Sequence, residues 1–420
     1  MLMVFKPYNI RRRTVHIENL VNITLKIKDH KATSCTVDGN LVVTFEAKLR
    51  RHLPCGKCGT RAHRHDRLPE RVWQHVPLWG YPVFLVYRPW RVRCPYCGIK
   101  REELPWAIGK ARLTRALVVT LATWAKLLPV ETVASLFGVS WNTVYAAVRA
   151  AVASGLKDRT LGTVLHIGID EISRKKGHKY LTQVYDLDTR TLLWSGEDRK
   201  EDTLRAFFRE YPQLAETVTA VCCDMWAPYI NVVRECLPRA EIVFDKFHIV
   251  RHLIEAVDQV RREEAHELRK KNADILKETR YVLLKNEERL TEKQRLRLKD
   301  LQRHNLKSIR AWLLKENFRE FWQSSNEQDA QWFLQQWNWM AAHSRLEPIK
   351  KFVKLVRKHI GGILAYFKHR ITNGVVEALN NTAKAISHRA RGYRTVKAFS
   401  QVMLLCMGGL EMPTLYHEFM

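Results

Sequence analysis

The sequence has no long hydrophobic run and no secretory signal. No apolar stretch approaches the roughly 18 residues that a membrane-spanning helix needs, and the first residues do not form the pattern of a secretory signal peptide. The sequence therefore predicts a cytoplasmic protein without a membrane partner.

Acidic residues are scarce relative to basic ones. The 420 residues include 71 Lys and Arg but only 43 Asp and Glu, which gives a formal net charge of +28. The excess is spread along the chain rather than confined to a tail, so the expected partner is a polyanion, most simply nucleic acid. With 46% hydrophobic residues the chain can still bury a sizeable core, and its length suggests roughly two to four domains.

Cysteine is uncommon, and its spacing argues against a disulfide framework. Of nine cysteines, four form two C-x-x-C pairs, Cys55 with Cys58 and Cys94 with Cys97. Four thiolates in two such turns suit one structural Zn²⁺, because the neighbouring glycines let the backbone fold back towards the ion. The strand-like run PVFLVYRPWRVR between the pairs is consistent with a zinc ribbon. The alternative is a coincidental set of free thiols. Three nearby histidines are alternative ligands, although surface positions suit them better: His63, His65 and His75.

Two helices with a short turn between them follow the cysteine pairs. In VETVASLFGVSWNTVYAAVRAAV a first helix leads to a turn at Gly138 and then to a second helix capped by Ser140. The apolar spacing is typical of a helix-turn-helix. A helical hairpin inside a core would show similar spacing, but the positive net charge favours double-stranded DNA as a partner. The residues expected to begin the helix that reads the groove are Ser140, Trp141, Asn142, Thr143 and Tyr145.

Two strand-like runs end in aspartate. In TVLHIGID the side chains alternate, so Asp170 shares a face with Gly168, whereas Glu171 falls at the edge of the apolar face. Asp170 is therefore the better candidate for chemistry. VTAVCCD ends in the same way at Asp224. Aspartates that end neighbouring strands, which lie about 4.8 Å apart, can hold hard cations such as Mg²⁺. Either aspartate alone could instead be a turn or cap residue.

A third carboxylate is found in ITNGVVEALNNTAKAI. Asn373 can cap a helix in which an acid, an amide and a lysine share one face, Glu377, Asn381 and Lys384. These side chains could meet metal and phosphate, although an ordinary solvated helix face explains the spacing equally simply. The buried stripe of this helix is expected to consist of Val375, Leu379, Ala383 and Ile386.

Together these motifs resemble the bacterial insertion-sequence transposases of the ISL-three group. The resemblance rests on the cysteine pairs, the helix-turn-helix, and the segments GIDEISRKKGHKY, DMWAPY, FDKFHIV and TNGVVEALNNTAKAISHRARGYR, which follow one another along nearly the whole chain. It implies an α/β ribonuclease H-like catalytic core with an Asp-Asp-Glu triad of Asp170, Asp224 and Glu377. In DKFH, Asp245 and His248 resemble the Asp-x-x-His motif of several transposase families. His248 would then orient groups at the active site, although a histidine bonded to a backbone carbonyl is an equally simple explanation.

The separation of Asp224 from Glu377 is too long for a compact core without an insertion. From Arg239 to Glu347 the sequence contains neither glycine nor proline, which predicts an all-helical insertion. Its tryptophans are expected in the helix core rather than stacked on an unpaired base, and a leucine run there could serve dimerisation. The predicted segments are an N-terminal region with strands and the zinc ribbon (1–105), the helix-turn-helix (106–158), the first part of the catalytic core (159–250), the insertion (251–365) and the C-terminal part of the core with the catalytic glutamate (366–420).

The resemblance also implies a reaction. The enzyme would bind the terminal inverted repeats of an insertion sequence, cleave phosphodiester bonds at its ends and join the 3′-hydroxyl to target DNA. The triad would hold two Mg²⁺ ions, or Mn²⁺, and cutting two ends together would require a homodimer or a higher oligomer on the DNA of the nucleoid. The alternatives are a non-catalytic, transposase-derived DNA-binding regulator and a nuclease of the same fold. Further residues expected at phosphates are Lys175, Lys176, Lys179, Lys384, Arg389, Arg391 and Arg394.

Overall fold

The computed structural model describes residues 17–25, 27–48, 51–107, 109, 111–175, 179–371 and 374–411. These residues form two compact units. As far as they are described, the first unit comprises Met1–Arg159, Arg389–Cys406 and the chain from Leu410, and the second comprises Thr160–His388 and Met407–Gly409. The predicted C-terminal segment 366–420 is thus divided between the units. None of the described helices is long and apolar enough to cross a membrane.

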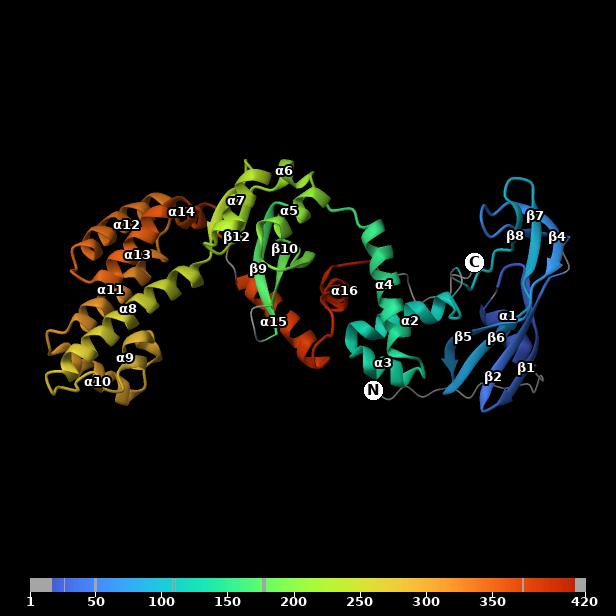
Figure 1. The fold of residues 1–420 in the computed structure, drawn as a ribbon, viewed down its shortest axis with the longest axis horizontal. Coiled ribbons are helices and arrows are strands. Elements are labelled where there is room, and N and C mark those ends of the chain that lie inside the picture. Colours follow the sequence, from blue (N-terminus) through green and yellow to red (C-terminus); the bar gives the residue numbers. More distant parts are fainter. Residues whose placement is uncertain are drawn as a thin grey trace, which may run out of the picture. The chain divides into compact units, whose positions relative to one another are not determined.

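The N-terminal part of the first unit consists of a short helix and two four-stranded sheets (Figure 1). The elements are α1 (Ile17–Leu25), β1 (His30–Asp38), β2 (Asn40–Ala47), β3 (His52–Pro54), β4 (Arg61–Arg67), β5 (Arg71–Leu78), β6 (Tyr81–Tyr87), β7 (Trp90–Cys94) and β8 (Gly98–Arg101). One sheet has the order β1-β2-β6-β5 and the other β3-β4-β7-β8. The alternation predicted for β6 is confirmed, because Val83, Leu85 and Tyr87 are buried and the residues between them are half-buried.

Three helices complete the middle of the first unit: α2 (Arg115–Leu127), α3 (Val130–Leu136) and α4 (Trp141–Asp158). The predicted turn between α3 and α4 is present, and Gly138 has a φ of +60°, a conformation that glycine adopts without strain. The Ser140 side chain caps α4 by accepting a hydrogen bond from the Thr143 backbone N–H at 3.1 Å. Val133 and Val144 are fully buried, so both helices pack on a common core.

The second unit is built on a five-stranded mixed sheet. Its strands are β9 (His166–Lys175), β10 (Lys179–Asp186), β11 (Thr191–Glu197), β12 (Ala220–Cys223) and β13 (Glu241–Phe244). The order is β11-β10-β9-β12-β13, with β9, β10 and β11 antiparallel and β12 parallel to both β9 and β13. On one face the sheet shares a hydrophobic core with α5 (Glu201–Glu210), α6 (Leu214–Thr217) and α7 (Ala227–Cys236).

Two helices approach the other face closely because glycines leave room for them: α14 (Ile360–His369) and α15 (Gly374–Arg389). A Cβ atom at Gly168 of β9 would lie 2.4 Å from Cγ2 of Val376 in α15. A Cβ at Gly362 of α14 would lie 2.4 Å from the Phe244 ring in β13. The face that Gly168 leaves open is therefore occupied by α15, which carries Glu377.

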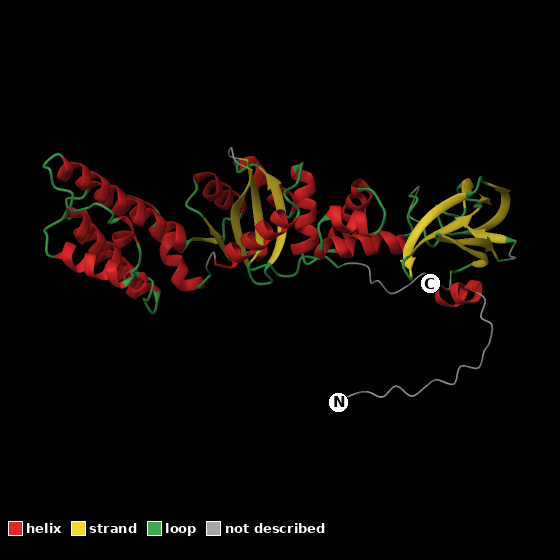
Figure 2. Ribbon diagram, turned by 90° about the horizontal axis from the view of Figure 1, so that it is seen from below, coloured by secondary structure: helices red, strands yellow, loops and turns green. Residues whose placement is uncertain are grey.

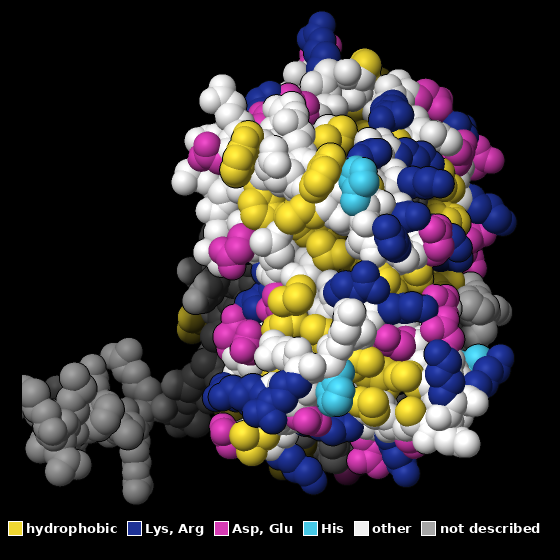
Figure 3. All heavy atoms as spheres, turned by 90° about the vertical axis from the view of Figure 1, so that its left-hand side faces the viewer, with side chains coloured by type: hydrophobic (Ala, Val, Ile, Leu, Met, Phe, Trp, Pro, Cys, Tyr) yellow, Lys and Arg dark blue, Asp and Glu magenta, His cyan; other side chains and the backbone are white. Residues whose placement is uncertain are grey.

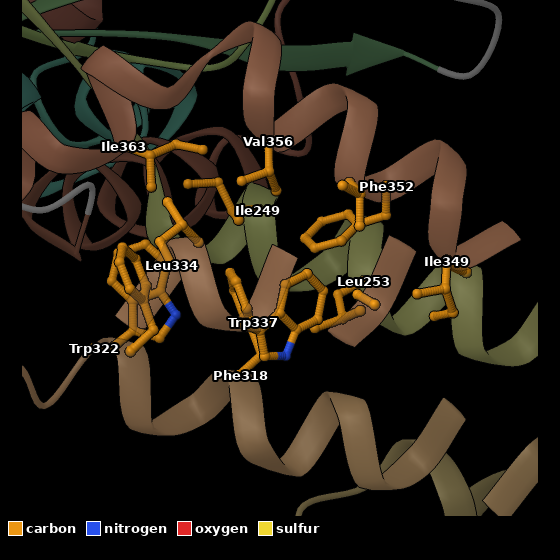
Figure 4. Packing of buried hydrophobic residues seen from close by; sticks show 14 of the residues in the cluster. Ile249, Leu253, Phe318, Trp322, Leu334, Trp337, Ile349, Phe352, Val356 and Ile363 are labelled. Atoms are coloured by element: carbon orange, nitrogen blue, oxygen red, sulfur yellow. The ribbon is translucent and has the colours of Figure 1, made fainter. Parts of the chain in front are cut away.

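The segment between β13 and α14 is helical, as the sequence predicts (Figure 2). Its elements are α8 (Lys246–Arg269), α9 (Arg280–Leu284), the 3-10 turn η1 (Glu287–Arg289), α10 (Glu292–Gln302), α11 (Lys307–Phe321), α12 (Glu327–Ala342) and α13 (Glu347–Lys358). Figure 4 shows Trp337 of α12 among Phe318, Leu253 and Phe352, which belong to three other helices. The insertion therefore has a hydrophobic core of its own.

The tryptophans of the insertion fall into two groups. Trp312, Trp322 and Trp337 are buried, as expected for core residues. Trp332 and Trp339 are each 64% exposed, so for these two the prediction of core packing is wrong. Figure 3 shows one face of the insertion, on which hydrophobic side chains lie among Lys and Arg side chains. The basic excess thus extends over this helical segment as well.

Candidate active site and metal centre

The sheet register brings the two predicted aspartates to the same end of the sheet. β9 and β12 run parallel, with Ala220 opposite His166 and Cys222 opposite Gly168. The same register continued by two residues places Asp224, which directly follows β12, beside Asp170. β9 itself continues to Lys175, so the expectation that this strand ends at Asp170 is wrong. The two aspartates, each of which follows an apolar run in the sequence, therefore lie next to each other in the fold.

His248 connects Asp224 to a further acid that follows β13. Asp245 caps α8 by accepting a hydrogen bond from the Phe247 backbone N–H at 3.1 Å. His248, in the first turn of α8, places Nδ1 2.9 Å from Oδ1 of Asp224 and Nε2 3.6 Å from Oδ2 of Asp245. The ring of His248 thus contacts two carboxylates rather than a backbone carbonyl, which the sequence left as the other explanation.

Glu377 and Asp170 line the same cavity. Glu377 lies in the first turn of α15, and its side chain is exposed. The cavity has a volume of about 410 Å³. Its lining residues come from β9, from the start of α8 and from α15: Asp170, Glu171, Asp245, Phe247, His248, Arg251, Glu377, Asn380 and Lys384. Asp224 reaches this group through its contact with His248.

Asn380 is a site residue that the sequence did not reveal. Only 5% of it is exposed. Its Nδ2 donates to Oδ2 of Asp170 at 2.7 Å, and its Oδ1 accepts from the Tyr185 hydroxyl at 2.7 Å. The buried stripe of α15 contains Val376 and Asn380, not Val375 and Leu379. Ala383 and Ile386 are buried as predicted, so the predicted stripe is wrong only in the first half of the helix. There, a buried, hydrogen-bonded asparagine counts as a surface residue in a hydrophobicity pattern.

Glu171 also lines the cavity, although strand alternation placed it at the apolar face. The Tyr229 hydroxyl donates to Oε2 of Glu171 at 3.2 Å, and Arg199 Nη1 lies 3.6 Å from Oε1. β12 ends at Cys223, so β9 has no partner on that side beyond Gly168. Side chains from both faces of β9 can therefore reach the end of the sheet.

The carboxyl groups of the site differ in their electrostatics. Burial raises the pKa of Asp170 to about 6, with a further contribution from the neighbouring Glu171 charge. Burial, followed by the charge of Asp224, also raises the pKa of Glu171. Burial acts in the same direction on Asp224, but the hydrogen bond and positive charge of His248 outweigh it and lower the pKa of Asp224. The same hydrogen bond raises the pKa of His248.

The raised pKa of Asp170 predicts a pH-dependent stability difference in buffer without added Mg²⁺. The folded chain binds this proton more tightly than the unfolded chain, so the wild type loses stability as the pH rises from about 4 to about 6, by roughly 1–3 kcal/mol. Asp170→Asn lacks this titration, so the stability of the variant relative to wild type should increase between pH 4 and pH 7. Unfolding monitored at both pH values measures the change, and an unchanged difference would contradict the assignment.

The oxygen-rich donors of this site fit a hard cation such as Mg²⁺. Among the described residues, however, no three acidic or histidine side chains place their ligand atoms within 4.8 Å of one another.

The four predicted cysteines do come together. Cys55, Cys58, Cys94 and Cys97 place their sulfur atoms within 4.8 Å of one another, and this is the only such cluster among the described residues. The Sγ atoms of Cys58 and Cys94 lie 3.5 Å apart, close to the edge of about 3.8 Å expected for sulfurs around tetrahedral zinc. Hydrogen bonds from Thr60 lower the pKa of Cys58 to about 6, which favours the thiolate that binds metal. The donor set fits Zn²⁺ and leaves no position open for a substrate.

The histidines near the cysteines are engaged elsewhere. The Nε2 atoms of His63 and His52 lie 3.0 Å apart. His75 is buried, and its Nδ1 lies 2.9 Å from the Thr114 hydroxyl. His65 is exposed on β4. No histidine belongs to the cysteine cluster.

The predicted DNA contacts are divided between the two units. At the start of α4, Asn142 is exposed, and Trp141, Thr143 and Tyr145 are half-buried. Lys384 lines the acidic cavity. Arg389, Arg391 and Arg394 belong to the first unit, with the helix-turn-helix. The remaining candidates lie outside the residues whose side chains are described: Lys175, Lys176 and Lys179.

Comparisons with known proteins agree with this architecture. A model of the DDE transposases of family ISL3 matches residues 167–403, and a model of the helix-turn-helix domain of the same family matches residues 102–152. The transposase for insertion sequence element IS1001 of Bordetella parapertussis is 32% identical over 354 residues, which are 82% of this chain and 86% of that protein. The transposase for insertion sequence element IS1557 of Mycobacterium tuberculosis is 31% identical over 396 residues, 88% of each chain.

Among solved structures, the Drosophila P element transposase strand transfer complex covers 70% of this chain and 92% of its own, with 12% identity and a TM-score of 0.40. The family matches and the two bacterial relatives confirm the resemblance drawn from the sequence. The chain belongs to the ISL3 family of DDE transposases, the ISL-three group named above.

Proposed function

We propose that the cavity at the end of the sheet is the catalytic centre for DNA cleavage and strand transfer, with Asp170, Asp224 and Glu377 as its triad. One observation carries the proposal. Glu377 and Asp170, far apart in the chain, line a single cavity, and His248 connects Asp224 to it. A non-catalytic DNA-binding regulator, the alternative function, would not need these three acids at the end of the sheet.

We also propose that this unit has a ribonuclease H-like fold. Three antiparallel strands are followed by two parallel ones, in the order β11-β10-β9-β12-β13. Asp170 lies within β9, Asp224 directly follows the adjacent strand β12, and the last acid is carried by a helix on the sheet. The helical insertion lies between β13 and α14, so it does not interrupt the sheet.

The chain's own residues have separate roles in this proposal. Two divalent cations, when bound to the triad, would stabilise the charges of the attacking and leaving oxygens. Asn380, itself held by the Tyr185 hydroxyl, positions Asp170, and His248 positions Asp224. Lys384 faces the cavity and offers a positive charge to a DNA phosphate. Water or a 3′-hydroxyl is the nucleophile, so no covalent bond to the protein is required.

Recognition of the terminal inverted repeats is assigned to the first unit. Phosphate contacts alone do not specify sequence, whereas a helix that enters the major groove reads base edges. α4 begins with the exposed Asn142, which suits this task. The cysteine cluster would hold one structural Zn²⁺ that organises the sheet beside it. Two ends cut together imply at least a homodimer on DNA.

Asn380→Ala should lower the cleavage rate by about ten- to a hundredfold while leaving DNA binding unchanged. The substitution removes a hydrogen bond to a buried charged group, worth roughly 1.5–3 kcal/mol, and frees the Asp170 carboxylate to rotate. Single-turnover cleavage and binding are measured on the same end DNA. Asn381→Ala is the matched control, because Asn381 is exposed on the same helix and, unlike Glu377 and Lys384, does not line the cavity. Equal rates for the two variants would contradict a positioning role for Asn380.

The proposed function is tested on DNA that carries the element's own ends. The full chain, with and without Mg²⁺, is incubated with labelled end DNA, and binding and strand cleavage are measured together. We expect specific binding in both conditions and cleavage with Mg²⁺ that is lost in Asp224→Asn while binding is retained. Binding without cleavage by a zinc-loaded, assembled protein would favour the regulator. Cleavage of unrelated DNA or RNA at the same rate would favour the nuclease.

A further inference from the structure

The segment Arg389–Thr395, here named the arginine loop, belongs to the same compact unit as the helix-turn-helix. The model of the family's catalytic region extends through it to residue 403, whereas the model of the helix-turn-helix domain ends at residue 152. In the structure, residues Arg389–Cys406 cluster with the first unit. The position of the arginine loop therefore points to a task in DNA recognition rather than in catalysis.

The arginine loop is held at both ends by specific contacts. At its start, the Arg389 guanidinium donates to the backbone carbonyl of Leu127 at 2.6 Å and to that of Lys126 at 3.2 Å. These are carbonyls of the last turn of α2, where an arginine also complements the helix dipole. Near its end, the Tyr393 ring stacks on the buried Phe399 with centroids 5.3 Å apart. The loop thus has a defined place next to the helix-turn-helix.

A cleft of about 930 Å³ lies between the arginine loop and the helix-turn-helix, within the first unit. One wall consists of residues 129–132 at the start of α3 and of Trp141, Asn142 and Tyr145 in α4. The other wall is the arginine loop together with Ala398 of α16 (Val396–Met407). The cleft therefore includes the part of α4 that a helix-turn-helix presents to the major groove.

The chemistry of the cleft fits a DNA backbone. Arg391 and Arg394 are exposed, and the backbone turns sharply between them at Gly392, whose φ is +88°. Guanidinium groups bind phosphate in a planar, two-pronged geometry. Glu131 is the only acid that lines the cleft, so phosphates are expected on the wall formed by the arginine loop. An acidic protein would satisfy the arginines but would leave Asn142, at the start of the reading helix, without base edges to contact.

We propose that the arginine loop and the first turn of α4 form one composite site for duplex DNA of the terminal repeat. α4 contacts base edges in the major groove, and Arg391 and Arg394 contact the phosphates that border this groove. The inference rests on the proposed recognition of the terminal repeats by the first unit. It adds that residues of the segment assigned to catalysis by the family model contribute to the affinity for the element's ends.

The test compares DNA binding by variants of the full chain. The probe is a fluorescent duplex with the element's own terminal repeat, and a scrambled duplex of equal composition is the reference. Arg391→Ala with Arg394→Ala should bind the repeat roughly ten- to a hundredfold more weakly, and the slope of log affinity against log salt should fall by about two. Lysines at both positions should restore the wild-type salt slope but only part of the affinity, since they keep the charge and lose the two-pronged geometry. The control pair, Arg303→Ala with Arg310→Ala, removes two exposed arginines of the insertion.

A hydroxyl-radical footprint locates the contacts. The double alanine variant should lose protection only next to the base pairs that Asn142→Ala affects, and the control pair should keep the wild-type pattern there. If the double alanine variant has the affinity and the footprint of the wild type, while the wild type prefers the repeat over the scrambled duplex, this inference alone is overturned. A wild-type chain without preference for the repeat over the scrambled duplex would overturn the proposed recognition and this inference with it. A double lysine variant whose salt slope equals that of the double alanine variant would also overturn the phosphate contacts.

Discussion

Glu377→Gln should lower cleavage of the element's own ends by about a thousandfold or more while changing DNA binding by no more than about twofold. Glutamine keeps the shape of the side chain but removes the negative charge that a divalent cation needs. Loss of one preorganised group that stabilises transition-state charge costs roughly 10²–10³ in rate, and loss of a metal ligand should cost at least as much. Single-turnover cleavage and equilibrium binding on the same labelled DNA measure the two effects separately.

The position of Glu377 in the structure indicates that this substitution should change cleavage without disturbing the fold. Glu377 is exposed in the first turn of α15, so its substitution should not disturb the packing of Val376 against β9. Glu292→Gln is a matched control at an equivalent place, the first turn of α10, with a side chain that is 78% exposed. A Glu377→Gln chain that cleaves at the wild-type rate would remove this residue from the proposed triad.

The sequence predicted the two aspartates from local patterns alone. Alternation identifies the face of β9 that carries Asp170, and the apolar run before Asp224 identifies the end of β12. The parallel register then makes the two positions neighbours. Glu377 could not be reached in this way, because the helical insertion separates it from the sheet. Only the resemblance to a family connected Glu377 with Asp170, and the geometry of the cavity agrees with that connection.

The supporting residues were missed for physical reasons. Asn380 is polar and buried, so its burial depends on two hydrogen-bond partners that lie about 200 positions earlier in the chain. Glu171 faces the cavity because β12 is shorter than β9, and strand lengths in a sheet do not follow from alternation. Trp332 and Trp339 are exposed although hydrophobicity predicts burial. In each case the determining contact is tertiary, and a pattern within one segment does not contain it.

The division of the chain into structural parts could likewise be predicted from the sequence only in part. The absence of glycine and proline between Arg239 and Glu347 predicted the insertion correctly. The sequence gives no sign, however, that the chain changes unit at Arg389, within a helix that begins in the other unit. Helical periodicity continues through such a point, because it depends on neighbouring residues and not on which core the next turn joins.

Removal of zinc should unfold the β3-β4-β7-β8 sheet of the first unit, whose strands lie next to the four cysteines. Cys55 and Cys94 are buried in the same hydrophobic core as Leu53 and Trp73, so the metal and the core are coupled. Structural zinc contributes roughly 10–16 kcal/mol of binding free energy in small domains, far more than a sheet of four short strands can replace. We expect one Zn²⁺ per chain, a large fall in the melting temperature after chelation, and loss of specific DNA binding.

Cys94→Ser should reproduce this loss, because a serine hydroxyl is a poor ligand for zinc and the remaining thiolates would lie beside an incomplete coordination shell. Cys35→Ser provides the control, since Cys35 is half-buried on β1 and lies outside the cysteine cluster. Zinc released on titration with a thiol reagent gives the stoichiometry, and thermal unfolding gives the stability. A Cys94→Ser chain with full zinc content and an unchanged melting temperature would mean that the four sulfurs meet without holding a metal, and that the hydrophobic core around Trp73 stabilises both N-terminal sheets alone.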